Sequence, residues 1–373
     1  MAAATAIPLV DLQLQHREVA SEIEAGFARV MAQGSFILGP DVAVFEEAFA
    51  SFCEVAHCVG VASGTDALEL ALRAVDIGPG DEVIVPVNTF IASALAVSRC
   101  GATPIFVDCD DTHGLIDVAA VAAAIGPRTK ALLPVHLYGQ MAPMALLEGL
   151  AEGHGLKLIE DAAQSQGARQ DGRSSGSIGA AAGSSFYPGK NLGAYGDAGA
   201  TLTGRADVAT RLRELRNYGS ERKYHHPLAG FNSRLDSLQA VVLNAKLSRL
   251  AEWNEQRRRA AARYADLLGD ADGVGLPSEA AGNTHVWHLY VIRVAERDRV
   301  LEALHDKGIG AGIHYPFPLH QTGAYRASAP DGAFPVAERR AGEILSLPLF
   351  PGISDAQQEA VVSALLEARA GRL

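Results

Sequence analysis

The stretch Glu82-Val83-Ile84-Val85, followed after a helical segment by Pro104-Ile105-Phe106-Val107-Asp108, decides the expected fold. Both runs are short and apolar, and residues 91–99 between them have the pattern of a helix. Near-continuous apolar strands separated by helices are typical of a parallel sheet that is covered on both faces. The same alternation extends from about residue 58 to residue 203. It predicts a large α/β domain in which helices sandwich a mostly parallel sheet.

The pattern changes beyond about residue 204. Helical patterns and one further strand, at 287–294, follow there; the helices are expected at 207–216, 233–250, 250–268, 297–307 and 355–370. A chain of 373 residues is too long for one small core and suits a large domain with a smaller one. We therefore expect a large domain over residues 1–250 and a small C-terminal α+β domain over residues 251–373.

Composition places the chain among ordinary water-soluble proteins, with 48% hydrophobic and 20% charged residues. No apolar run approaches the roughly 20 residues that span a bilayer, and the N-terminal residues do not resemble a secretion signal. We expect no membrane association and a cytoplasmic location. The net charge of −11 argues against nonspecific binding to nucleic acid, which depends on neutralising phosphates. The basic run Arg257-Arg258-Arg259 is interpreted as the solvated face of a helix.

Lys190 lies in the run SSFYPGKNLG at residues 184–193, which contains little bulk and little charge. Upstream, Asp161 closes an apolar strand that begins at residue 157. A lysine in a tight loop and an acid at a strand end form the pair that pyridoxal phosphate requires. The lysine forms a Schiff base with the aldehyde, and the acid keeps the ring nitrogen protonated. On its own the pair does not identify the cofactor, because most loop lysines are solvated and Asp161 could simply cap a short helix.

A phosphate site is predicted at Ser63-Gly64-Thr65, between the strand ending at Ala62 and the helix after it. Small residues let the backbone approach a phosphate, and the start of a helix offers unpaired N–H groups. The alternative is that Ser63 or Thr65 only caps the helix. Phe90, at another strand-to-helix junction, could stack on a cofactor ring or belong to the core.

Other phosphate, dinucleotide and metal motifs do not fit. The segment from Gly183 to Lys190 has the wrong glycine spacing for a P-loop, and Asn191 stands where a Ser or Thr is needed. No GxGxxG follows the first strand. The four cysteines lack CxxC spacing, and the histidines are not joined by acids or cysteines at useful spacing, so reduced thiols and no metal site are expected.

Seven segments together resemble the DegT-type sugar aminotransferases, which have the aspartate-aminotransferase-like fold of PLP-dependent transferases (fold type I). The segments are residues 34–40, 63–68, 134–140, 160–164, 185–199, 232–236 and 314–316. They occur in order along essentially the whole chain. The resemblance implies an enzyme that uses pyridoxal 5′-phosphate to transfer the amino group of L-glutamate to a nucleotide-linked ketosugar.

The resemblance also assigns roles to individual residues. Lys190 would carry the Schiff base and Asp161 would pair with the pyridine nitrogen. The residues implied to bind the cofactor are Gly64, Thr65, Phe90, Asp161, Gln164, Ser185, Lys190 and Asn232, with Gly64, Thr65 and Ser185 on the phosphate, Phe90 stacked on the ring and Gln164 facing it. Asn232 would reach the phosphate from a partner subunit, which implies a homodimer with shared active sites. The sugar-nucleotide cleft would be lined by Tyr187, Lys223, Tyr315 and His320.

The motifs are most similar to those of members acting on a dTDP-3-keto-6-deoxyhexose, which gives a dTDP-3-amino sugar. Enzymes that aminate C-4 share the same cofactor residues, so amination of a dTDP-4-keto-6-deoxyhexose stays open. Amination of a keto-cyclitol is a second alternative. A regulatory protein that binds the cofactor without turnover is a third, which the joint presence of Lys190, Asp161 and Asn232 disfavours.

Overall fold

The computed structural model describes residues 6–269 and 271–370. Its largest element is a seven-stranded sheet in the order β1-β9-β8-β5-β4-β2-β3. The strands are β1 (His57–Val61), β2 (Glu82–Pro86), β3 (Thr103–Val107), β4 (Thr129–Leu132), β5 (Lys157–Asp161), β8 (Ala181–Ser185) and β9 (Gly199–Thr203). The run from β3 through β2, β4 and β5 to β8 is parallel, whereas β9 is antiparallel to both β8 and β1. The prediction of an α/β fold with a mostly parallel sheet is confirmed.

Strand β9 runs against its neighbours because it follows β8 through a loop, without a crossover helix. Parallel strands need a long connection, usually a helix, whereas antiparallel neighbours do not. The loop between these two strands, residues 186–198, contains Lys190. The reversal therefore keeps this lysine at the edge of the sheet where the parallel strands end.

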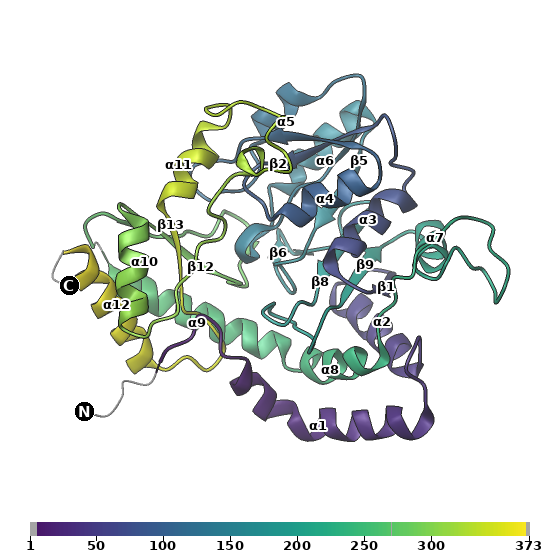
Figure 1. The fold of residues 1–373 in the computed structure, drawn as a ribbon, viewed down its shortest axis with the longest axis horizontal. Helices are drawn as coiled ribbons and strands as arrows, with labels where there is room; N and C mark the ends of the chain where they lie inside the picture. Colours follow the sequence, from purple (N-terminus) through teal and green to yellow (C-terminus); the bar gives the residue numbers. More distant parts are fainter. Residues whose placement is uncertain (1–5, 270, 371–373) are drawn as a thin grey trace.

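Helices cover both faces of the large sheet (Figure 1). One face is packed by α3 (Gly64–Ala74), α4 (Ile91–Arg99) and α7 (Ala206–Arg216), and the other by α2 (Pro40–Phe52), α5 (Val118–Ala124), α6 (Met144–His154) and α8 (Ser237–Leu247). Alternate residues of β2 show why both faces must be covered. Val83 and Val85 belong to the hydrophobic cluster on the face that α3 and α4 cover, and Ile84 belongs to the cluster on the face that α5 and α6 cover. All three side chains are fully buried.

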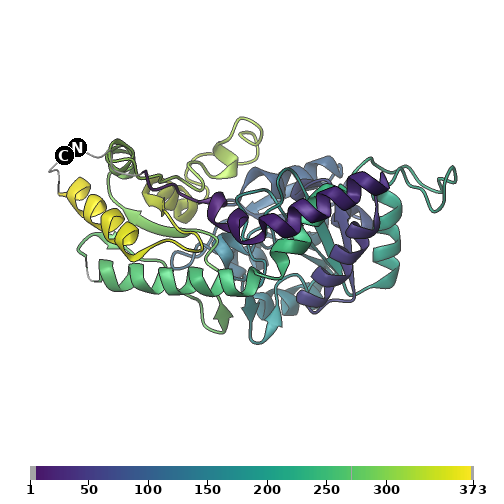
Figure 2. The same ribbon diagram turned by 90° about the horizontal axis from the view of Figure 1, so that it is seen from below.

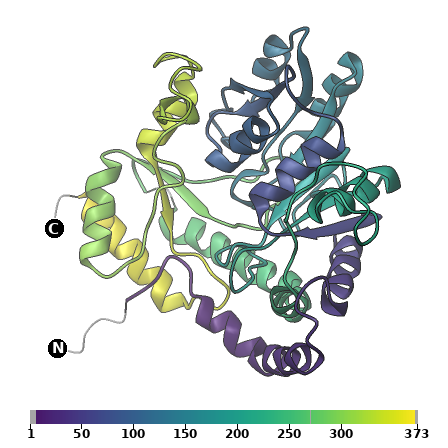
Figure 3. The same ribbon diagram turned by 45° about the vertical axis from the view of Figure 1, so that its right-hand side comes forward.

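The second unit surrounds a three-stranded antiparallel sheet in the order β10-β12-β13, seen at the left of Figure 1 and again in Figure 3. Its elements are β10 (Val274–Gly275), β12 (Tyr290–Val294), α10 (Arg297–Asp306), β13 (Ile344–Leu347) and α12 (Asp355–Arg369). The long helix α9 (Leu250–Leu268) leads from the large sheet into this unit, as Figure 2 shows. A hydrophobic cluster containing Tyr264, Ile292 and Leu365 forms the core of the unit.

The remaining elements connect the two units. They are α1 (Leu12–Gln33), η1 (Leu137–Gly139), η2 (Leu319–Gln321), α11 (Pro335–Glu343) and a small sheet of β6 (Arg169–Gln170), β7 (Arg173–Ser174) and β11 (Asn283–Thr284). Ile7 packs in the core of the C-terminal unit, while Leu319 and Ala337 pack in a core of the large sheet. The division at residue 250 stays a prediction, and these crossings show that chain segments from each side of it contribute to the other side.

The prediction of a solvated arginine run on α9 is wrong for one of its three members. Arg257 is 1% exposed, and its Nη1 donates hydrogen bonds to the carbonyl oxygens of Trp287 and Leu349, at 3.2 and 3.0 Å. Burial lowers the pKa of this guanidinium to about 10. Arg257 therefore joins α9 to two segments of the C-terminal unit by hydrogen bonds. The sequence does not indicate this role, because Arg257 stands in a run of three arginines that is typical of a solvated helix face.

The four cysteines lie in the interior of the described chain. Cys53, Cys58, Cys100 and Cys109 are buried and free, and burial raises the pKa of each thiol. Within residues 6–269 and 271–370, no helix has the length and apolar character needed to cross a membrane.

Candidate active site

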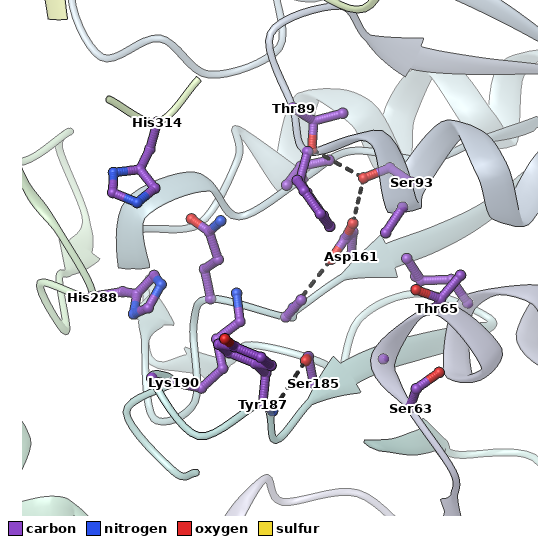
Figure 4. Close-up of a pocket in the computed structure, with 18 of the residues that line it drawn as sticks. Ser63, Thr65, Thr89, Ser93, Asp161, Ser185, Tyr187, Lys190, His288 and His314 are labelled. Atoms are coloured by element: carbon purple, nitrogen blue, oxygen red, sulfur yellow. Dashed lines mark hydrogen bonds between the residues drawn. The ribbon is translucent and has the colours of Figure 1, made fainter. Parts of the chain in front are cut away.

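A cavity of about 460 Å³ opens at the carboxyl ends of the parallel strands. Ligands of open α/β sheets bind at this edge. Nine of the twelve residues to which the resemblance gives a role line the cavity: Gly64, Thr65, Phe90, Asp161, Gln164, Ser185, Tyr187, Lys190 and Tyr315. Figure 4 shows Lys190 and Asp161 near its middle, with Ser63 and Thr65 toward one end and His288 and His314 toward the other.

The start of α3 forms the first end of the cavity. Ser63 caps the helix, since its side chain accepts a hydrogen bond from the backbone N–H of Asp66 at 3.1 Å. A Cβ atom built on Gly64 would lie 2.4 Å from the Cβ of Ser185, so only glycine fits between the helix and β8. The cap role and the phosphate role are thus compatible. Small side chains and free helical N–H groups face the cavity, a combination suited to an anion.

The resemblance implies that Gly64 holds the cofactor phosphate, so replacing Gly64 with alanine is expected to weaken cofactor binding. The new methyl group must displace Ser185. If this displacement removes one hydrogen bond to the charged phosphate, the binding free energy weakens by about 1.5–3 kcal/mol. The dissociation constant of pyridoxal phosphate would then rise roughly 10- to 100-fold. Fluorescence titration of the cofactor measures this. Gly78→Ala is the matched control, because a Cβ atom there meets nothing within 4 Å. Equal dissociation constants for the two variants would contradict a phosphate site at Gly64.

Asp161 is held at the end of β5 by two donors. It is 4% exposed; the hydroxyl of Ser93 donates to its Oδ2 at 2.7 Å, and the backbone N–H of Ala163 donates to its Oδ1 at 3.1 Å. Thr89 in turn shares a 2.9 Å hydrogen bond with Ser93. Burial raises the pKa of Asp161, while these donors and the charge of Lys190 oppose the rise. A buried carboxyl of this kind gains from a cation placed beside it.

Lys190 lies in a loop that hydrogen bonds hold in place. Its backbone N–H donates to the carbonyl of Tyr187 at 2.8 Å, which closes a turn. The next residue, Asn191, is 1% exposed, and its Nδ2 donates to Asn254 Oδ1 and to the carbonyl of Val286, both at 2.9 Å. Burial lowers the pKa of Lys190 to about 8, against the opposing effect of Asp161. The amine is therefore far more often neutral near neutral pH than that of a surface lysine.

Gln164 connects the cavity wall to the segment around Tyr315. Its Oε1 accepts from the backbone N–H of Tyr138 at 2.7 Å, and its Nε2 donates to the hydroxyl of Tyr315 at 3.0 Å. The ring of Tyr315 lies 5.3 Å from that of Phe90, centroid to centroid. Phe90 is 50% exposed, so it is not the core residue that its junction position also allowed.

Three residues singled out from the sequence lie elsewhere. Asn232 and Lys223 are exposed; Lys223 belongs to the loop that follows α7 and projects from the body of the protein in Figures 1 and 2, and Asn232 closes that loop against Asn217. His320 is fully buried in η2, where its Nε2 is 3.1 Å from Glu338 Oε1 and its ring packs against Phe334. In this structure His320 does not line the cavity, because its side chain is enclosed by packing.

The sequence reasoning missed several lining residues. Ser93 could have been found, since it lies one helical turn after Thr89 at the start of α4, behind a buried strand. His314 lies in the family-like segment 314–316 but was given no role there, whereas His288 had no signal, because it reaches the cavity from a distant part of the chain. Burial and the charge of Lys190 lower the pKa of both, that of His314 to about 4. Both imidazoles are therefore neutral near pH 7.

Comparison with known proteins agrees with this geometry. The model of the DegT/DnrJ/EryC1/StrS aminotransferase family matches residues 17–366. The dTDP-3-amino-3,4,6-trideoxy-alpha-D-glucose transaminase of Streptomyces venezuelae is 49% identical over 362 residues, which cover 97% of this chain and 96% of that protein. The crystal structure of S. venezuelae DesV has a TM-score of 0.95 at 49% identity and covers 98% of each chain. That of NtdA from Bacillus subtilis, solved with bound cofactor PMP, has a TM-score of 0.91 at 30% identity, covering 98% of this chain and 86% of NtdA. The chain belongs to the DegT/DnrJ/EryC1/StrS aminotransferase family and is an aminotransferase.

Proposed function

We propose that the protein uses pyridoxal 5′-phosphate to transfer the amino group of L-glutamate to a nucleotide-linked ketosugar. The observation that carries the proposal is the placement of Lys190 and Asp161 in one cavity with the start of α3. These features supply an amine of lowered pKa, a buried carboxyl and an anion site. They match the aldehyde, the ring nitrogen and the phosphate of the cofactor.

The residues present fit the cofactor in three respects. Gly64, Thr65 and Ser185 line the cavity at the start of α3, and the absence of a Cβ at Gly64 lets the helix N-terminus lie close against Ser185, so a phosphate in the cavity could be reached by both. Asp161 has donors on both oxygens, yet burial still raises its pKa, so a pyridinium N–H would find a carboxylate that benefits from its charge. Phe90 and Gln164 line the same cavity, where the cofactor ring would lie. When bound, pyridoxal phosphate supplies an aldehyde that condenses with amines and a ring that accepts electrons.

Lys190 is proposed to move the proton in both halves of the reaction. With the cofactor and glutamate bound, the neutral amine of Lys190 would take the proton from the α-carbon of glutamate and hold it for return to the neighbouring carbon. The lowered pKa suits this task, because a general base works best when its pKa is near the working pH. The same steps in reverse place the amine on the ketosugar.

For the sugar we propose a dTDP-3-keto-6-deoxyhexose, which would give a dTDP-3-amino sugar. The support is the name of the Streptomyces venezuelae relative, a dTDP-3-amino-3,4,6-trideoxy-alpha-D-glucose transaminase; another 49% identical relative is named for a UDP-linked 3-keto sugar, so amination at C-3 has more support than the nucleotide base. Amination at C-4 and amination of a keto-cyclitol are the alternatives.

The experiment that tests this proposal starts from enzyme converted by glutamate to its pyridoxamine form and freed of excess donor. Adding dTDP-4-keto-6-deoxyglucose should leave the absorbance unchanged until a 3,4-ketoisomerase is supplied, after which the absorbance of the aldehyde form returns. A fast return without the isomerase would place the new amine at C-4. No conversion by glutamate in the first step would favour a regulatory protein instead.

We also propose that the active unit is a homodimer. Phe36 and Ile37 are nearly half exposed, and Tyr187 at the cavity is 60% exposed. Lys223 and Asn232 belong to the projecting loop and its base, and neither lines the cavity of its own chain. A second copy could cover the apolar side chains and receive Asn232 at its phosphate site. Tyr187, Lys223 and Tyr315 remain the proposed contacts of the sugar nucleotide, and His320 is set aside because it is enclosed.

A further inference from the structure

His288 reaches the cavity beside Lys190, and the proposed reaction gives it no task. Figure 4 shows its ring on the other side of Lys190 from Ser63 and Thr65. His288 is 8% exposed, and burial together with the charge of Lys190 lowers its pKa well below the usual range. An imidazole that stays neutral beside a site of proton transfer acts there through the hydrogen bonds of its two ring nitrogens.

One of these nitrogens is occupied by Asn191, the residue that follows Lys190. The Nδ1 atom of His288 is 3.2 Å from Asn191 Oδ1. The amide of Asn191 can face only this way, because its Nδ2 is 2.9 Å from the carbonyl oxygen of Val286, which can only accept. Asn191 Oδ1 is therefore an acceptor, and the hydrogen of the neutral ring is on Nδ1. A neutral imidazole carries one N–H group, so Nε2 of His288 has a bare lone pair.

This lone pair and the amine of Lys190 both lack a partner. In the part of the chain that the structure describes, neither Nε2 of His288 nor Nζ of Lys190 makes a hydrogen bond. The imidazole is held in place, since Asn191 bonds its ring and Arg257 Nη1 is 3.4 Å from its backbone carbonyl oxygen. A buried nitrogen without a partner costs free energy, which a donor in the cavity would recover.

We propose that Asn191 and His288 are positioning residues for Lys190: Nε2 of His288 accepts a hydrogen bond from the ammonium that Lys190 forms while it holds the substrate's proton. The inference rests on the proposed function and deepens it. Asn191 fixes the tautomer that makes this hydrogen bond possible. The bond stabilises the ammonium as the proton leaves the α-carbon, and it orients the ammonium for the return of the proton. The proton stays on Lys190, because the pKa of His288 is too low for the imidazole to take it.

The first test needs no turnover. Full-length protein with ¹⁵N-labelled histidine is loaded with pyridoxamine phosphate, a form in which the amine of Lys190 is free, and the ring nitrogens are observed by NMR near neutral pH. The signals of His288 are those that are missing from His288→Gln. They should show a hydrogen on Nδ1 and a bare Nε2. Those of His285 should show the opposite tautomer, since the backbone N–H of Trp287 donates to its Nδ1 at 2.8 Å.

The contact itself is read from the Nε2 signal of His288. This signal should shift in Lys190→Ala, which removes the donor. It should stay in place in Lys246→Met, because Lys246 is equally buried but does not line the cavity.

The second test measures the single-turnover rate of the pyridoxal form with glutamate and with glutamate deuterated at the α-carbon. His288→Phe keeps a ring but offers no acceptor. It should slow the reaction roughly 10- to 100-fold, the effect of one hydrogen bond to a charged group, with a larger isotope effect and an unchanged half-saturating glutamate concentration. His288→Gln should restore most of the rate, because its amide can donate to Asn191 and offer an oxygen to Lys190. His285→Phe is the matched control and should keep the wild-type rate, since His285 is buried but does not line the cavity.

An Nε2 atom of His288 that carries a hydrogen, or whose signal does not respond to Lys190→Ala, would overturn the inference. Equal rates and equal isotope effects in His288→Phe and the wild type would also overturn it. Wild-type protein that does not react with glutamate would overturn the proposed function instead. The two failures are distinguishable, because the NMR signals are read without any reaction and decide the contact between His288 and Lys190 in either case.

Discussion

Replacing Lys190 with alanine is expected to abolish transamination and to remove the covalent hold on the cofactor. The proposed function gives this one amine two tasks, the bond to the aldehyde and the proton transfer at the reacting carbon. Loss of a general base alone slows reactions by about 10²- to 10⁴-fold. The measurement is the single-turnover rate with glutamate, together with borohydride reduction and peptide mapping. Reduction should fix the cofactor on Lys190 in the wild type and on no lysine in the variant.

The control for this prediction is a second buried lysine. Lys246 is 1% exposed, its pKa is also lowered to about 8 by burial, and its Nζ donates to the carbonyl of Gly193 at 2.7 Å. It does not line the cavity. Lys246→Met should therefore still carry the cofactor on Lys190 after reduction, whatever its effect on stability. Attachment at another lysine, or turnover by Lys190→Ala, would remove Lys190 from the mechanism.

The pH dependence of cofactor uptake checks the same residue without a substitution. A neutral amine attacks the aldehyde, and the pKa of Lys190 is lowered from 10.5 to about 8. Uptake of pyridoxal phosphate by the cofactor-free protein should therefore rise with pH and level off just above pH 8. A rise that continues toward pH 10 would show an ordinary, solvated lysine.

The main sheet could be predicted because its strands are short apolar runs separated by helices. The helix over residues 91–99 begins and ends where the pattern placed it. The helix expected at 233–250 is shorter, because residues 233–236 lead into α8 as extended chain and the break at Ser248 and Arg249 starts α9. Local patterns therefore locate elements well, but they locate ends poorly where two helices follow each other closely.

The shared cavity of Lys190 and Asp161 could be predicted from chain order alone. Both residues follow strands whose carboxyl ends meet at one edge of the sheet, so the topology brings them together. The lining residue Leu9 could not be predicted in this way, because its segment is held at the cavity by a hydrogen bond from the backbone N–H of Gly310 to the carbonyl of Ile7, about 300 residues apart along the chain. Arg257 was misplaced for a similar reason, since its partners lie in segments 287–288 and 349.

Replacing Asp161 with asparagine is expected to slow transamination while the cofactor still binds. Asparagine keeps the shape, and its oxygen can accept the hydrogen bond from Ala163, so the end of β5 should hold its position. The charge is lost, however, and a cationic ring nitrogen would face a neutral amide. Removing one partner of a buried ion pair costs about 3–5 kcal/mol, which corresponds to a slowing of roughly 10²- to 10⁴-fold when that charge is needed in the reaction.

Stopped-flow absorbance with glutamate measures this rate, and fluorescence titration measures cofactor binding in the same variant. Ser93→Ala is the control, because it removes the 2.7 Å donor to Asp161 and leaves the carboxylate in place. It should raise the pKa of Asp161 further and have a smaller effect on the rate, since the charge can still form beside a cation. Equal rates for Asp161→Asn and the wild type would show that the carboxylate takes no part in the reaction. In that case the buried position of Asp161 would serve only to join β5 to the start of α4.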